Sequence, residues 1–174
     1  EAQLERLATT DMLTGLVNRS QFDTVLKSEL NRHDRYSRPL SLIMLDLDYF
    51  KNINDSYGHD VGDQVLIELA HLLKHNLRKA DCCARWGGEE FMLLAPETSL
   101  EQAVRLADKI RSTIKHAVFP IQGSVTASFG VVEVHPQESL KSVMKRADNA
   151  LYLAKDKGRD QVSTGGLLSS AKQA

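Results

Sequence analysis

The chain has 174 residues, 42% of them hydrophobic and 26% charged, which is enough for one sizeable core and too few for two. Its 22 Lys and Arg and 23 Asp and Glu give a formal charge of −1, which argues against a general binder of nucleic-acid polymers. No apolar run approaches the roughly 20 residues of a spanning helix, so no direct membrane insertion by this segment is expected. Cys82 and Cys83 are adjacent and form no disulfide framework, so a reducing, cytoplasmic location is predicted.

Hydrophobic spacing predicts the elements of the first half of the chain. Leu4 and Leu7 share one face of a short charged segment, which we interpret as the end of a longer helix. Pro39 stops the helical spacing that precedes it, and Asp60 is the expected cap of the next long helix. In chain order the sequence predicts the end of a signalling or linker helix at 1–10, a helix at 22–30, a buried strand at 40–46, a loop at 52–62 and a helix at 61–73.

The second half of the chain predicts a hairpin followed by alternating helices and strands. Gly87 and Gly88 separate two short apolar runs, and glycine supplies the positive φ angles that a tight hairpin needs. The predicted elements are strands at 82–86 and 91–95, a helix at 100–114, a strand at 125–132, a helix at 140–154 that Gly158 stops, and a flexible tail at 163–174. Helices interleaved with strands indicate a layered α/β or α+β domain.

Two acidic clusters are the strongest chemical signals. Asp46 and Asp48 follow a buried strand, and Asp46 needs a cation or a set of donors to offset its desolvation. Glu89 and Glu90 are expected at the tip of the hairpin. Taken alone, the first pair reads as caps of the following turn and the second as a solvated tip. With the hairpin beside the strand exit, the carboxylates offer the hard oxygen ligands that Mg²⁺ prefers, a set used in phosphoryl and nucleotidyl transfer.

Several ordered motifs make the chain similar to the GGDEF family of diguanylate cyclases. They are DMLTGLVNR at 11–19, DLDYFKNIND at 46–55, YGHDVGD at 57–63, WGGEEF at 86–91, SFG at 128–130 and ADNALYLAKDKGR at 147–159. The resemblance covers residues 11–162, the expected catalytic domain. It implies an α+β fold with a mainly antiparallel central sheet flanked by helices, similar to the palm of nucleotidyl cyclases and polymerases. The implied reaction joins two GTP molecules into cyclic di-GMP and pyrophosphate with Mg²⁺, for which Mn²⁺ is a substitute.

The resemblance also implies roles for individual residues. The expected metal ligands are Asp46, Glu89, Glu90 and the carbonyl of Leu47, and Glu89 would also accept the proton of the 3′-hydroxyl. The expected phosphate contacts are the catalytic Lys51, Lys155, Arg159 and the backbone amide of Phe50. The guanine edge would meet Asn54 and Asp63, with His59 lining the pocket. Read without the resemblance, Asn54 and Asp63 are caps, His59 is a surface histidine, and Lys155 and Arg159 complement a helix C-terminus.

A further pattern concerns regulation. Arg78 and Asp81 form an RxxD motif shortly before the Gly-Gly turn, which matches the family's inhibitory site for cyclic di-GMP. An arginine and an aspartate can bind phosphate and guanine edges. Read without the resemblance, the pair is a surface ion pair of little energetic consequence. Lys109 and Arg111 on the next helix are candidate additional cations.

The resemblance implies a homodimer in which two GTP-bearing sites face each other. Because the chain begins with Glu1 rather than Met, we expect an upstream sensory domain in a longer protein, including a membrane-anchored one. The alternative function is a non-catalytic domain that senses GTP or cyclic di-GMP and acts through a protein partner. Two departures from the family pattern are small: Arg159 is followed by Asp160 where Asn is usual, and Glu89 stands where many members have Asp.

Overall fold

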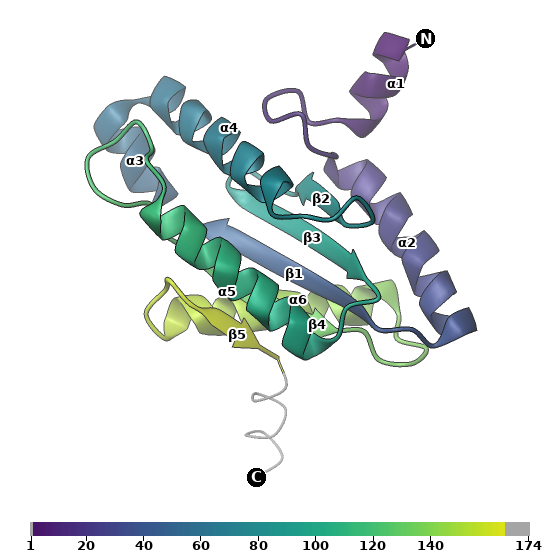
Figure 1. The fold of residues 1–174 in the computed structure, drawn as a ribbon. Coiled ribbons are helices and arrows are strands. Elements are labelled where there is room, and N and C mark those ends of the chain that lie inside the picture. Colours follow the sequence, from purple (N-terminus) through teal and green to yellow (C-terminus); the bar gives the residue numbers. More distant parts are fainter. Residues whose placement is uncertain (1, 166–174) are drawn as a thin grey trace.

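The computed structural model describes residues 2–165, which form one five-stranded sheet with helices on both faces (Figure 1). In chain order the elements are α1 (Ala2–Thr9), α2 (Arg19–Tyr36), β1 (Leu40–Leu47), α3 (Phe50–Tyr57), α4 (His59–His75), β2 (Cys82–Arg85), β3 (Glu90–Pro96), α5 (Leu100–His116), β4 (Ala127–Glu133), α6 (Leu140–Asp156) and β5 (Val162–Thr164). The layered α+β prediction is therefore confirmed.

The sheet has the strand order β2-β3-β1-β4-β5. β1 lies at the centre and pairs antiparallel with both β3 and β4. β2 and β3 form the predicted hairpin, and only β5 runs parallel to its neighbour β4 among the described strands. The eight residues of β1 are all buried, as expected for a strand covered on both faces.

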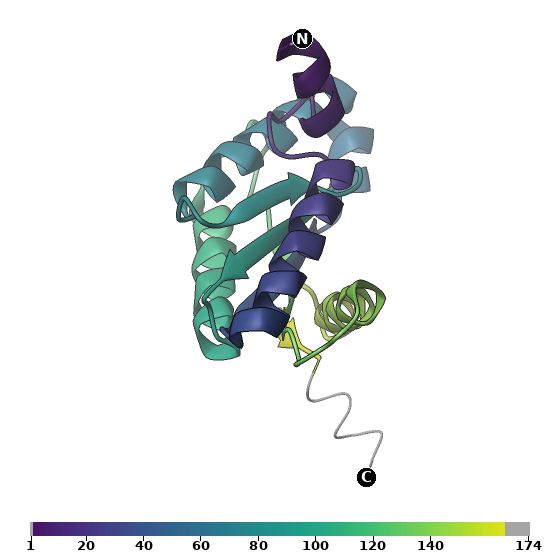
Figure 2. The same cartoon turned by 90° about the vertical axis from the view of Figure 1, so that its right-hand side faces the viewer.

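Each face of the sheet has its own hydrophobic core. Because successive side chains of a strand point to opposite faces, Ile43 and Leu45 pack with α3, α4 and α5, whereas Leu42 and Met44 pack with α2 and α6. In Figure 2 the strands run between α5 on one side and α6 on the other, with α2 nearest the viewer. On this second face, α2 covers one half of the sheet and α6 covers the other.

The predicted loop at 52–62 is wrong. This segment holds α3 and the start of α4, separated only by Gly58, whose φ of +89° breaks the helix. Phe50 and Ile53 are the buried side of α3, a pattern too short for periodicity to reveal. Asp60 is not the cap of α4, because the N-cap position is Gly58 and no side chain caps it; Asp60 lies in the first turn, where an acid complements the helix dipole.

The hairpin is confirmed, but its predicted turn chemistry is wrong. Neither Gly87 nor Gly88 has a positive φ. The turn is closed instead by the backbone amides of Trp86 and Gly87, which donate to the Glu90 carbonyl at 2.8 and 3.2 Å. Glu89 lies at the tip, and Glu90 is the first residue of β3.

The predicted C-terminal tail begins too early. Ser163 and Thr164 pair with Gly130 and Val131 as part of β5, so they belong to the sheet. The rest of the predicted tail, residues 166–174, lies outside the described residues.

Gly130 provides a test of how α6 packs on β4. A Cβ at this position would lie 2.4 Å from the Leu151 nitrogen and 2.6 Å from the Ala147 carbonyl oxygen, both in the backbone of α6. Because a helix backbone cannot yield locally, Gly130→Ala is expected to lower the free energy of unfolding by about 1–3 kcal/mol. Thermal unfolding measures this. Gly88→Ala is the control, since nothing lies within 4 Å of its Cβ, and equal stability of the two variants would contradict the packing.

Candidate active site

The predicted acidic residues meet where β1 ends and β3 begins. Asp46 is the register partner of Glu90, and the Leu47 amide donates to the Glu89 carbonyl at 3.3 Å. Asp46 and Glu90 continue the strand face of Met44 and Met92, so both point to the α6 side of the sheet. The structure thus brings together the two acidic clusters that were far apart in the sequence.

Asp46 is buried and forms an ion pair with Lys155 of α6. Lys155 therefore supplies the cation that a carboxylate at a strand exit needs. Burial raises the pKa of Asp46 to about 6, although the hydrogen bond and charge of Lys155 act in the opposite direction. The nearby charges of Glu89 and Glu90 raise this pKa further. A buried carboxylate with a strongly shifted pKa beside other carboxylates is typical of a functional site.

Asp48 holds together the loops around the site rather than capping a turn. Its carboxylate accepts hydrogen bonds from the Thr126 hydroxyl at 2.7 Å, the Ser128 hydroxyl at 2.6 Å and the Asp160 amide at 3.0 Å. The N-cap position of α3 is Tyr49, and no side chain caps that helix. The cap interpretation of Asp46 and Asp48 is therefore wrong: Asp46 pairs with Lys155 of α6, and Asp48 binds residues of and near β4.

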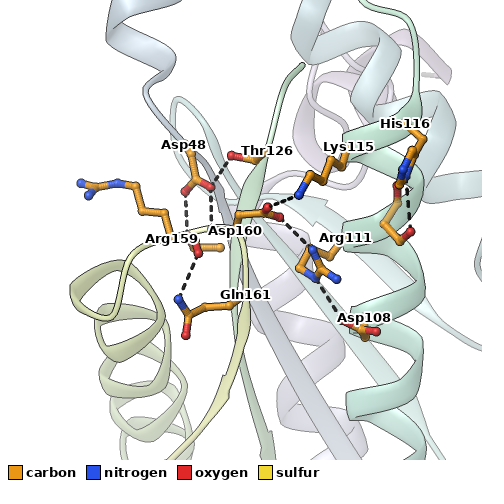
Figure 3. A network of polar contacts seen from close by, with 11 residues as sticks. Asp48, Asp108, Arg111, Lys115, His116, Thr126, Arg159, Asp160 and Gln161 are labelled. Atoms are coloured by element: carbon orange, nitrogen blue, oxygen red, sulfur yellow. Dashed lines mark hydrogen bonds and ion pairs between the residues drawn. The ribbon is translucent and has the colours of Figure 1, made fainter. Parts of the chain in front are cut away.

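Asp160 anchors the turn after α6 to α5, as Figure 3 shows. Its carboxylate accepts from Arg111 and Lys115, each at 2.9 Å. Partial burial alone would raise the pKa of Asp160, but these two cations lower it. The neighbouring Arg159 lies over the Tyr49 ring at 4.8 Å from its centroid. The departure from the usual Asn at position 160 thus adds ion pairs with Arg111 and Lys115 of α5.

Asn54 lies on α3 and Asp63 on α4, the two helices that Gly58 separates. The Asn54 Oδ1 atom is buried without a hydrogen-bond partner among the described residues, and a Cβ at Gly62 would lie 1.8 Å from it. A glycine is therefore required beside this amide. Asp63 and His59 are exposed at the start of α4. An unsatisfied buried amide atom calls for a ligand or a water.

The predicted phosphate contacts surround the same strand exit. Phe50 is buried at the start of α3, next to the exposed Lys51. Lys155 and Arg159 are half-buried at the end of α6 and in the turn that follows. Of these cations, Lys155 pairs with Asp46, and Arg159 lies over the ring of Tyr49 just before α3.

The three carboxylates do not form a preassembled metal centre: residues 2–165 contain no group of three or more His, Cys, Asp or Glu side chains arranged for one. Asp46 is engaged by Lys155 instead. Mg²⁺ is usually bound by one or two carboxylates and completed by substrate phosphates and water. Asp46 and Glu90 in register, with Glu89 beside them, fit that pattern of oxygen ligands.

Arg85 was missed by the sequence analysis. Its guanidinium donates to the Gly88 carbonyl at 3.1 and 2.9 Å and pairs with Asp11 at 3.3 Å. It therefore holds the hairpin tip to the segment that follows α1. The sequence offered no periodic signal for it, because Arg85 ends a four-residue strand and Asp11 lies 74 positions earlier.

Arg78 and Asp81 form an ion pair at 3.0 Å, in which Asp81 is nearly buried and Arg78 is 57% exposed. Arg78 also donates to the Pro96 carbonyl and the Thr98 hydroxyl, each at 2.8 Å. The adjoining groove has a volume of about 260 Å³ and includes Arg105 of α5, but not the predicted Lys109. These contacts hold Arg78 in place beside the groove.

The sequence profile described as "Diguanylate cyclase, GGDEF domain" matches residues 8–161. The chain belongs to the GGDEF family. Among curated relatives of this GGDEF domain, the diguanylate cyclase DgcM of Escherichia coli K12 is 43% identical over 162 residues, which are 93% of this chain and 40% of DgcM. The diguanylate cyclase DgcP of Pseudomonas aeruginosa is 44% identical over 158 residues, covering 89% of this chain and 24% of DgcP. The chain thus spans less than half the length of both relatives.

Solved GGDEF structures share the fold. The coiled coil and GGDEF domain of DgcB from Caulobacter crescentus, in complex with c-di-GMP, superposes with a TM-score of 0.90 at 34% identity, covering 94% of this chain and 88% of that one. The active GGEEF domain of a diguanylate cyclase from Vibrio cholerae gives a TM-score of 0.82 at 36% identity, covering 86% and 97%. Within residues 2–165, no helix has the length and apolar character needed to cross a membrane.

Proposed function

We propose that this GGDEF domain condenses two GTP molecules into cyclic di-GMP and two pyrophosphates. The observation that supports this best is the register pairing of Asp46 with Glu90, beside Glu89 and next to Lys155 of α6. This cluster supports an assignment of acidic metal ligands and a phosphate-binding cation to one strand exit. Family membership makes the same reaction the first expectation.

The reaction assigns separate tasks to the residues around the strand exit. Mg²⁺ or Mn²⁺, held by Asp46, Glu89, Glu90 and the Leu47 carbonyl, would neutralise phosphate charge. Glu89 accepts the proton of the attacking 3′-hydroxyl, the role that the family resemblance implies for the carboxylate at this hairpin tip. Lys51, Lys155, Arg159 and the Phe50 amide bind the phosphates.

Guanine recognition is assigned to Asn54 and Asp63. The unsatisfied Asn54 amide and the exposed Asp63 carboxylate offer acceptors to the N1 and N2 donors of guanine. Adenine lacks that donor pattern and would leave both groups unpaired, which penalises it. His59 lines the same pocket.

The domain works as a homodimer, since each copy has one set of guanine and phosphate contacts and the product needs two nucleotides. We further propose that an upstream sensory domain controls the pairing, and that the domain acts in the cytoplasm or on the cytoplasmic side of a membrane-anchored protein. Arg85 supports this control, because its bonds to Asp11 and Gly88 connect the end of α1 to the hairpin tip.

The groove at Arg78 and Asp81 is the proposed inhibitory site for cyclic di-GMP. Replacing Arg78 by Ala removes a guanidinium from the groove, and one charge-assisted contact accounts for about 10-fold in affinity or more. We therefore expect the inhibition constant for added cyclic di-GMP to rise by about 10-fold or more, while the initial rate changes little. Initial rates at increasing product concentration measure this, with Lys109→Ala as the control. Unchanged inhibition in Arg78→Ala would overturn the assignment.

The function is tested by incubating the concentrated protein with GTP and Mg²⁺ and separating the nucleotides by chromatography. Cyclic di-GMP is expected from GTP, and no cyclic dinucleotide from ATP. A folded, dimeric protein that binds GTP but makes no product would contradict the cyclase and favour the alternative, a non-catalytic domain that senses GTP or cyclic di-GMP and acts through a protein partner.

A further inference from the structure

A groove lies between α2 and α6, on the sheet face that carries the catalytic carboxylates. It has a volume of about 740 Å³. Its apolar floor is made by Met44 of β1, Trp86 of the hairpin and Met144 of α6. Glu90 also lines it, so the groove is continuous with the proposed metal site.

The rim of this groove carries charges of both signs. The cations are Arg19, Lys141 and Lys145, and the acids other than Glu90 are Asp23 and Asp148. Lys141, Lys145 and Asp148 are exposed and form no ion pair with another described residue. Arg19 lies 4.2 Å above the Trp86 ring centroid, which keeps this aromatic side chain fixed at the groove wall.

The reaction identifies which partner can occupy the groove. The second GTP must reach Asp46 and Glu90 from a side that the protein leaves open. On the other side of the sheet, α3 and α4 carry the proposed guanine contacts for the copy's own GTP, whereas the groove between α2 and α6 opens beside Glu90 and is left for the partner. A second copy carrying its own GTP therefore approaches across this groove.

The mixed charges agree with a partner identical to this chain. In a two-fold interface the same surface patch meets itself, so each cation of one copy needs an acid of the other. The groove supplies both signs around an apolar floor, the composition of a self-complementary contact.

We propose that the α2/α6 groove is the surface through which two copies dock to form the active dimer. Met44, Trp86 and Met144 supply the apolar contact, and Lys141 and Lys145 face Asp23 and Asp148 of the partner. The inference rests on the proposed function, since it specifies which surface brings the two GTP sites together.

Two complementary charge-reversal variants of the full chain test the docking surface. The first, Lys141→Glu with Lys145→Glu, has an acidic rim; the second, Asp23→Lys with Asp148→Lys, has a basic rim. Each is expected to repel its own copy and to lose about 10-fold or more of its cyclase rate at a fixed concentration. An equimolar mixture is expected to recover the rate to within about 2-fold of the parent, because opposite rims attract.

Controls separate this inference from the proposed function and from misfolding. Both variants are expected to retain the parent's GTP affinity, because no guanine or phosphate contact is changed. The first is expected to keep the parent's Tm, and the second to lose only the small contribution of the exposed Asp23–Lys27 ion pair. Glu101→Lys on α5, across the sheet, is expected to keep the parent's rate. Variants as active as the parent, or inactive variants whose mixture stays inactive, would overturn the docking surface. A parent that makes no product would instead refute the proposed function, and sedimentation with a non-hydrolysable GTP analogue would then still report whether the rims control pairing.

Discussion

Replacing Glu89 by Gln is expected to lower the rate of cyclic di-GMP formation by about 1,000-fold or more, which corresponds to at least about 4 kcal/mol of activation free energy. The amide keeps the size of the side chain but is neither a charged metal ligand nor an acceptor for the hydroxyl proton. Glu89 lies at the hairpin tip, and its side chain makes no hydrogen bond or ion pair with a described residue that the change would remove. The rate is measured by chromatography of the GTP reaction.

Glu101→Gln is the matched control, because it makes the same chemical change at an exposed position on α5. Both variants are expected to unfold at the parent's Tm. A Glu89→Gln protein that keeps the full rate would contradict the assignment of Glu89 to the metal and to the proton.

Lys155→Met is expected to have the second largest effect, lowering the rate by about 100-fold or more at neutral pH. Lys155 is the cation that faces the buried Asp46, and it is also a proposed phosphate contact. Without Lys155, the influence that lowers the pKa of Asp46 disappears, so this pKa rises above its present value of about 6. A larger fraction of Asp46 is then protonated at neutral pH, which makes it a poorer metal ligand.

The pH dependence distinguishes this explanation from a simple loss of phosphate binding. The parent is expected to lose activity as the pH falls through about 6, where Asp46 takes up a proton, and the variant at a higher pH. The free energy of unfolding depends on pH in the opposite direction to activity. The folded-state pKa of Asp46 lies above its ordinary value of 3.8, so protonation of Asp46 favours the folded state. This stabilisation grows as the pH falls through 6. Identical pH profiles of the two proteins would contradict the role of Lys155.

Much of the fold could be predicted because the apolar patterns were long. The run 40–46 and the helical spacing of Leu26 and Leu30 corresponded to β1 and α2. The elements that were wrong or shortened are short ones: α3 has eight residues and β5 has three. Neither is long enough to show a period, and both depend on tertiary contacts.

The site was predictable in composition but less so in geometry. The sequence motifs pointed to Asp46, Glu89 and Glu90, and the antiparallel register brings Asp46 and Glu90 together. Contacts between distant elements had no local signal. Asp48 binds Thr126 and Ser128 across the sheet, Arg85 reaches Asp11, and Arg111 pairs with Asp160.

Asp160 shows why a departure from a motif needs a structure for its interpretation. From the sequence, the acid in place of the usual Asn is only a small departure, but in the structure Arg111 and Lys115 of α5 pair with it. Its backbone amide, which any residue would supply, holds Asp48. The backbone amide at position 160 therefore holds Asp48 whatever the side chain is, whereas the ion pairs with the α5 cations depend on the aspartate.

The ratio of pyrophosphate to cyclic di-GMP is the most direct test of the central claim that two GTP molecules condense at the Asp46 and Glu90 site. The parent is incubated with GTP and Mg²⁺, and both products are quantified over time, with and without EDTA. The proposed reaction predicts two pyrophosphates for each cyclic di-GMP and no formation of either product after chelation. GTP binding by the dimer without release of pyrophosphate, or product formation that EDTA leaves unchanged, would contradict it.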